Sequence, residues 1–118
     1  MICIVDDDAS LRRSLRNLLM SVGFAVETFE SAEAFLEAPR RDSIGCVVLD
    51  VRMAGMSGLE LLRHLSSAGS RIPVIMLTAH ADEETRRRSL EAGAAAFLEK
   101  PVRSAALLDA VRTALTSM

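Results

Sequence analysis

Five short apolar runs punctuate the chain, and a segment with helical spacing follows each of them. The runs cover residues 2–5, 24–29, 45–50, 72–78 and 94–99. Short continuous apolar runs are typical of strands buried on both faces of a parallel sheet. Residues 24–29 alternate weakly, which predicts a strand at an edge. Pro73 is tolerable only at the start of its strand, because proline cannot donate a hydrogen bond to a sheet.

Helices are predicted after each run from their end signals and their apolar spacing. Residues that suit a helix N-terminus stand at Asp8, Ser31, Ser57, Asp82 and Ser104, and the stop signals are Gly23, Pro39 and Gly69. Ser57 and Glu60 fit a capping box. The expected apolar faces are Leu11, Leu15, Leu18, Leu19 and Val22; Leu59, Leu62 and Leu65; and Leu107, Leu108, Val111 and Leu115. The short helix that Ser31 opens carries Phe35 and Leu36. The helix over residues 82–91 is the most polar, with three consecutive arginines and Leu90 as its one large apolar residue.

Strands that alternate with helices over short connections predict one parallel sheet covered on both faces. The predicted fold is therefore α/β: a doubly wound five-stranded parallel sheet with five helices. The 118 residues suffice for one domain with its own core, and we expect residues 1–118 to form it.

Composition narrows the class of protein. The chain is 50% hydrophobic and 25% charged with a net charge of −2, which gives this domain no electrostatic reason to contact nucleic acid or an anionic membrane. No apolar run approaches the ~20 residues of a membrane span. Cys3 and Cys46 lie in apolar runs, where buried free thiols are common. These features predict a cytoplasmic protein without a disulfide.

Functional groups stand at the ends of four predicted strands. Asp6 and Asp7 follow the first, Asp50 ends the third, Thr78 ends the fourth and Lys100 follows the fifth. The carboxyl ends of parallel strands share one edge, where open α/β sheets place their ligands. Three carboxylates close together repel and need a cation, and all-oxygen ligands favour Mg²⁺, with Mn²⁺ as an alternative. Lys100 and Thr78 add donors for a phosphoryl group, so the set suits phosphoryl transfer.

Each of these residues also has a purely structural interpretation. Asp50 could cap a turn, and Asp6 and Asp7 could be ordinary acids at a helix start. Thr78 could be a β-branched residue at a strand end. Only the convergence of all the strand ends favours the functional interpretation.

The ordered motifs make the chain resemble the receiver domain of two-component response regulators, over essentially its whole length. The motifs are Asp6-Asp7, Asp50-Val51-Arg52-Met53 with Met56-Ser57-Gly58, Thr78-Ala79 and Lys100-Pro101. The resemblance implies a flavodoxin-like sheet with strand order 2-1-3-4-5. To our reading it is closest to receivers fused to helix-turn-helix output domains. Whether the chain is a stand-alone receiver or the input part of a longer regulator stays open.

The resemblance also assigns roles to residues. Asp50 would accept a phosphoryl group from the phosphohistidine of a sensor histidine kinase. Mg²⁺ would be bound by Asp7 and Asp50 directly, by Asp6 through water and by the backbone carbonyl of Arg52. Thr78 and Lys100 would stabilise the phosphoryl group, Thr78 and Phe97 would act as switch residues, and Lys100–Pro101 would be a cis peptide. The fourth helix, fifth strand and fifth helix would form a face for a partner, such as a second receiver.

Three features depart from the family pattern. Ala54 stands where a proline commonly follows the loop methionine, so the loop is expected to be less rigid. The arginine-rich fourth helix suggests a partner recognised by charge more than by apolar packing. Phe97 in place of tyrosine has no hydroxyl, so it can switch only through burial.

Rival functions are separated by particular residues. A flavodoxin-like cofactor binder needs a small, glycine-containing phosphate loop after the first strand, where this chain has three aspartates. An aspartyl-phosphate phosphatase is expected to carry an acid two residues after its nucleophile, and Arg52 cannot act as one. A degenerate receiver that only binds proteins is the third rival. Every expected site group is present, which favours an active phosphoacceptor switch over a degenerate receiver. We expect a phosphoacceptor domain rather than an enzyme.

Overall fold

The computed structural model describes residues 1–38, 43–80 and 82–116. Its elements follow the order β1 (Ile2–Val5), α1 (Ala9–Ser21), β2 (Val26–Phe29), α2 (Ala32–Glu37), β3 (Cys46–Asp50), α3 (Gly58–Ser67), β4 (Val74–Thr78), α4 (Glu83–Glu91), β5 (Ala96–Glu99) and α5 (Ser104–Thr116). The predicted stop at Pro39 and most of the loop at residues 40–44 lie outside the described residues. The strictly alternating order confirms the predicted strand–helix pattern.

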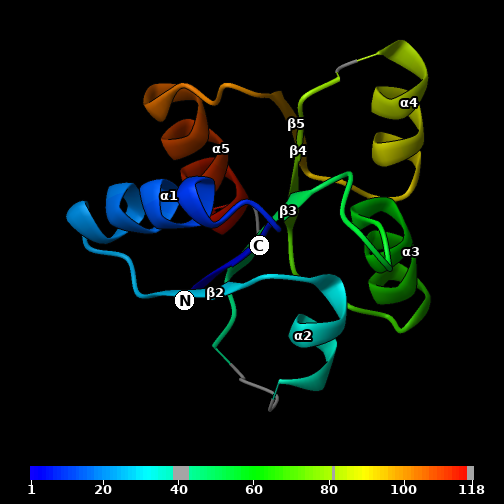
Figure 1. Ribbon diagram of the computed structural model, residues 1–118, viewed down its shortest axis with the longest axis horizontal. Helices are drawn as coiled ribbons and strands as arrows, with labels where there is room; N and C mark the ends of the chain where they lie inside the picture. The colour runs from blue at the N-terminus through cyan, green and yellow to red at the C-terminus, as the bar shows by residue number, and fades with distance from the viewer. Residues whose placement is uncertain (39–42, 81, 117–118) are drawn as a thin grey trace.

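All five strands form one parallel sheet in the order β2-β1-β3-β4-β5. Helices α1 and α5 cover one face, and α2, α3 and α4 lie on the other (Figure 1). The strand order and the two helical layers confirm the doubly wound fold. The weakly alternating second run is an edge strand, as predicted.

The core consists of two clusters, one on each face of the sheet. Residues of β1, β3 and β4 alternate between them: Ile4 and Val48 face α1 and α5, whereas Val5 and Leu49 face the α2 and α3 side. Every residue of β3 is buried. The apolar run that precedes Asp50 is thus fixed from both sides, as a central parallel strand requires.

Local caps explain where several elements begin and end. The side chains of Asp8, Ser31 and Asp82 each accept a hydrogen bond from the backbone N–H three residues on. Ser57 and Glu60 form the predicted capping box at the start of α3. Gly23 follows α1 with φ +99°, a left-handed conformation that glycine adopts without strain.

The predicted buried face of α3 was partly wrong. Leu61 and Leu62 are its buried leucines, whereas Leu59 and Leu65 are only partly covered. The helix begins at Gly58, and its orientation over the sheet turns positions 61 and 62 inward. Sequence spacing alone could not select between overlapping leucine stripes.

Several predicted boundaries also need correction. Strands β2, β4 and β5 each begin two residues later than predicted. Val22 is not part of the buried face of α1: it is the C-cap and is 42% exposed. Ser104 does not cap α5 but is its first helical residue, since Leu107 N–H already donates to Arg103 O.

Cys3 and Cys46 are both buried, as their apolar runs predicted, and they are not joined in a disulfide. Burial, with a smaller effect of Cys3, raises the pKa of the Cys46 thiol to about 12, so Cys46 stays neutral. None of the described helices has the length and hydropathy to cross a bilayer.

Candidate functional site

The parallel register brings four strand ends to one edge of the sheet. Asp6 follows β1, Asp50 is the last residue of β3, Thr78 is the last residue of β4 and Lys100 follows β5. Neighbouring strands pair in register up to these ends. Residues far apart in sequence therefore converge because each strand stops at the same level of the sheet.

Three carboxylates form the centre of this edge. Asp6, Asp7 and Asp50 each offer an oxygen, and these atoms lie within 4.8 Å of one another. Asp6 is 0% and Asp50 5% exposed, whereas Asp7 faces solvent. Burying two carboxylates side by side is unfavourable without a compensating cation.

Lys100 supplies part of that compensation. Its Nζ lies 3.0 Å from Asp6 Oδ2 and 3.4 Å from Asp50 Oδ1. Burial and the charge of Asp6 raise the pKa of Asp50, although Lys100 and the Arg52 N–H oppose that shift. Burial disfavours the Lys100 ammonium, but its contacts with Asp6 and Asp50 outweigh burial, so the pKa of Lys100 is raised. Pairing of Lys100 with Asp6 was not foreseen from the sequence.

Hydrogen bonds from neighbouring residues hold Asp6 and Asp50 in place. Asp8 N–H donates to Asp6 Oδ1 over 2.9 Å, and Arg12 Nη1 donates to the Asp6 carbonyl over 2.7 Å. Arg52 N–H donates to Asp50 Oδ1 over 3.3 Å. The sequence did not indicate this role, because nothing in its spacing distinguishes the half-buried Arg12 from the exposed Arg13 and Arg16 of the same helix.

The approach of α3 to β3 depends on Gly58. A Cβ at this position would collide with the Asp50 carbonyl, and Gly58 N–H donates to Val51 O over 2.8 Å. The glycine thus lets the start of α3 pack directly against the strand that carries Asp50.

Thr78 and Phe97 lie on the same face of the sheet, toward α3. Thr78 is buried, and its Oγ1 accepts from His80 N–H and donates to His80 O, at 3.1 and 3.2 Å. Phe97 pairs with Met76 in the register of β4 and β5 and is partly buried. Lys100 N–H donates to Thr78 O over 2.7 Å, and the Lys100–Pro101 peptide is cis. This segment therefore joins the ends of β4 and β5.

The charge and donors of the site fit a divalent cation. Three carboxylates and one ammonium leave a formal charge of −2. Asp6 Oδ2 is buried and has the Lys100 ion pair, but it accepts no well-formed hydrogen bond from the described residues. Hard carboxylate oxygens beside an open, solvent-facing position suit Mg²⁺, which keeps several waters.

Comparison with known proteins agrees with this geometry. The sequence matches the family model of the response regulator receiver domain over residues 2–112. The chain belongs to this family. It is 49% identical over 112 residues to the transcriptional regulatory protein TdiR of Thauera aromatica, covering 95% of this chain and 49% of TdiR. It is 47% identical to the transcriptional regulatory protein FixJ of Azorhizobium caulinodans, covering 95% of this chain and 53% of that protein.

Solved receiver structures have the same fold. The chain superposes on the response regulator StyR with a TM-score of 0.90 at 49% identity, covering 98% of this chain and 59% of that one. It superposes on FixJ-N with a TM-score of 0.90 at 39% identity, covering 99% and 94%. The chain spans about half the length of the curated relatives it matches, and three of these are named transcriptional regulatory proteins. Receivers of this family are in general signalling domains of two-component systems rather than enzymes.

Proposed function

We propose that this receiver domain is a phosphorylation-dependent switch in which Asp50 accepts a phosphoryl group from a sensor histidine kinase. The observation that carries the proposal is the cluster at the sheet edge. Asp50 lies at the end of a fully buried strand, beside Asp6, Asp7 and the Lys100 ammonium. Such a cluster offers a fixed nucleophile and positive charge where phosphoryl transfer develops negative charge.

In the transfer step, an Asp50 carboxylate oxygen attacks the phosphorus of the kinase phosphohistidine. A P–O bond forms as the P–N bond breaks, and the electron pair of that bond leaves with the imidazole nitrogen. When bound, Mg²⁺ neutralises charge on the phosphoryl oxygens. Asp7 and Asp50 would hold the ion directly, Asp6 through water and Arg52 through its backbone carbonyl.

Phosphorylation would redistribute the contacts at the site. The modified Asp50 carries about −2 charge, which attracts Lys100 and competes with Asp6 for its ammonium. The Thr78 hydroxyl, bonded to the His80 backbone in this structure, would turn to a phosphoryl oxygen. Phe97, on the same face, would follow into the space that Thr78 leaves. The face formed by α4, β5 and α5 would then bind a partner such as a second receiver.

The output would lie outside this chain. Three relatives of about twice its length are named transcriptional regulatory proteins, which supports a helix-turn-helix output domain in the full protein. The receiver itself would not contact nucleic acid, given its net charge of −2, and we place it in the cytoplasm.

Acetyl phosphate tests the proposal without a cognate kinase. Wild-type protein with Mg²⁺ should gain one phosphoryl group in an intact-mass measurement, and neither EDTA-treated protein nor Asp50→Asn should gain it. Asp109→Asn, an exposed residue of α5, is the matched control and should be phosphorylated normally. The absence of an adduct on wild type would instead favour a degenerate receiver that only binds proteins.

A further inference from the structure

The loop between β3 and α3 is fixed at both ends. Val51 N–H donates to Leu77 O, Gly58 N–H donates to Val51 O, and Ser57 caps α3. Residues 52–56 lie between these fixed points. They begin with Arg52, whose N–H bonds Asp50 Oδ1 and whose carbonyl is the proposed metal ligand. The shape of this short segment therefore bears directly on the site.

A carboxylate from another element holds the far end of the segment. Met56 N–H donates to Glu33 Oε2 over 2.9 Å, although the two residues are 23 positions apart. This N–H bond is the main reason that the pKa of Glu33 is lowered. Gly55 has φ +76°, and a Cβ there would come within 2.5 Å of Glu33 Oε2. The loop thus turns its backbone toward the carboxylate at a residue whose left-handed conformation favours glycine.

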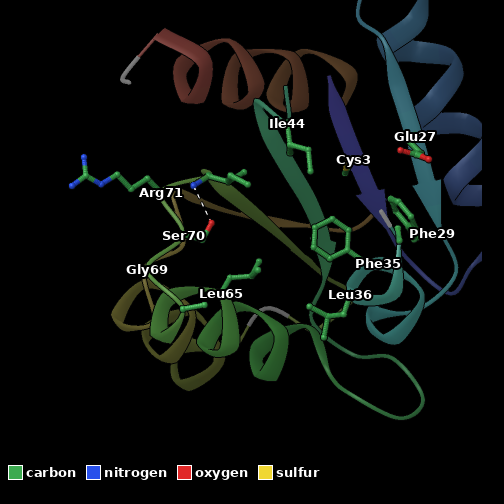
Figure 2. Close-up of a pocket in the computed structure, with 13 residues that line it drawn as sticks. Cys3, Glu27, Phe29, Phe35, Leu36, Ile44, Leu65, Gly69, Ser70 and Arg71 are labelled. Carbon is green, nitrogen blue, oxygen red and sulfur yellow. Dashed lines mark hydrogen bonds between the residues drawn. The ribbon is translucent and has the colours of Figure 1, made fainter. Parts of the chain in front are cut away.

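Helix α2, which carries Glu33, packs against the sheet. Phe35 packs edge-to-face on Phe29, with ring centroids 5.3 Å apart and planes at 89°, and Ala32 is fully buried. Beyond Phe35 a cleft of about 350 Å³ lies between α2 and α3, lined from the two helices by Leu36 and Leu65 among others (Figure 2). Met53 and Met56 of the β3–α3 loop belong to the same apolar cluster as Ala32 and Phe35 of α2. The Glu33–Met56 hydrogen bond adds a polar contact that fixes the loop backbone itself against α2.

We infer that Glu33 is a positioning residue for the Asp50 site, acting through the Met56 amide to fix residues 52–56. The inference rests on the proposed function and deepens it. In a chain with Ala54 in this loop, a side chain from α2 supplies restraint that the loop's own sequence lacks. A purely structural Glu33 would stabilise α2 and leave metal binding unchanged.

Three variants separate these roles: Glu33→Ala, which removes the acceptor; Glu33→Gln, which keeps an oxygen acceptor; and Glu37→Ala, the matched control on the same helix. Hydrogen exchange of the Met56 amide reports the loop, calorimetric titration reports Mg²⁺ affinity, and acetyl phosphate with intact mass reports phosphorylation. Urea denaturation confirms that all variants are folded under the conditions used.

For Glu33→Ala we expect Met56 exchange to accelerate at least about tenfold, since its N–H loses its acceptor. Glu33 acts on Arg52 only through the loop, so Mg²⁺ affinity should fall by about tenfold, the lower end of the loss seen when groups that support metal ligands are removed, and phosphorylation should slow with it. Glu33→Gln should recover most of the affinity, and Glu37→Ala should match wild type. The inference is overturned if Glu33→Ala keeps the wild-type rate of Met56 amide exchange and the wild-type Mg²⁺ affinity. It is also overturned if Glu37→Ala loses as much Mg²⁺ affinity as Glu33→Ala. Failure of wild type to be phosphorylated would overturn the proposed function alone, because exchange and Mg²⁺ affinity still decide the role of Glu33.

Discussion

Two ion pairs of similar length, one on α4 and one at the sheet edge, lie in contrasting environments. On α4, Arg88 Nη2 lies 2.7 Å from Glu84 Oε1, and the side chains are 52% and 62% exposed. At the sheet edge, Lys100 Nζ lies 3.0 Å from Asp6 Oδ2, with exposures of 19% and 1%. The shorter pair is screened by water and contributes little, whereas the longer one neutralises a buried charge. Burial, not distance, decides which pair the fold depends on.

The comparison also changes the interpretation of the arginine-rich helix. Arg86, Arg87 and Arg88 pair with three glutamates of α4 itself. The helix therefore does not present three free positive charges to a partner. Its surface is a mixed-charge face that neutralises itself, which weakens the expectation that a partner is recognised by net charge.

The largest effect is expected when the Lys100 ammonium is removed from the buried cluster. Lys100→Met in EDTA should lower the free energy of unfolding by about 3 kcal/mol, because two buried carboxylates lose their cation. Urea denaturation measures the loss, and Mg²⁺ should restore more stability to this variant than it adds to wild type. Arg63→Met, at an exposed position of α3, is the control. Equal stability of the two variants in EDTA would contradict the account of Lys100.

A second variant, Asp50→Asn, tests how the buried site makes the free energy of unfolding depend on pH. The pKa of Asp50 is raised by burial in the folded state above its ordinary value of 3.8, so its neutral form favours folding and its ionisation opposes it. In EDTA, the stability that Asp50 contributes is present below about pH 3.8 and is lost as pH rises through the folded pKa. Asp50→Asn cannot ionise, so its stability advantage over wild type should grow across that window and then level off. A difference that is constant or falls with pH would contradict the predicted sign.

The smallest effect is expected on α4. Arg88→Ala should change the free energy of unfolding by at most about 0.5 kcal/mol, as is usual for an exposed i,i+4 pair. A loss of several kcal/mol in urea denaturation would mean that this pair resembles the buried one. Raising the salt concentration should shrink the small effect further.

The sequence predicted the fold well because strand and helix periods are properties of local pattern. Continuous apolar runs marked the buried strands, and Asp8, Ser57 and Gly23 marked helix ends. The errors arose where tertiary packing chooses among similar local solutions. Leu61 rather than Leu59 faces the sheet, and Ser104 starts α5 instead of capping it.

The site was predictable only as a set of residues at one edge. Topology brought Asp6, Asp7, Asp50 and Lys100 together, because parallel strands end side by side. Side-chain directions were not predictable. Nothing in the sequence indicated that the Thr78 hydroxyl bonds the His80 backbone or that Glu33 reaches Met56.

The most direct test of the central claim is to locate the phosphoryl group on the chain. Wild-type protein treated with acetyl phosphate and Mg²⁺ is reduced with borohydride, which converts an aspartyl phosphate to an alcohol, and peptides are mapped by tandem mass spectrometry. The account predicts conversion at Asp50 alone, in the peptide that contains the end of β3. Conversion at Asp6 or Asp7, or at no residue, would contradict it.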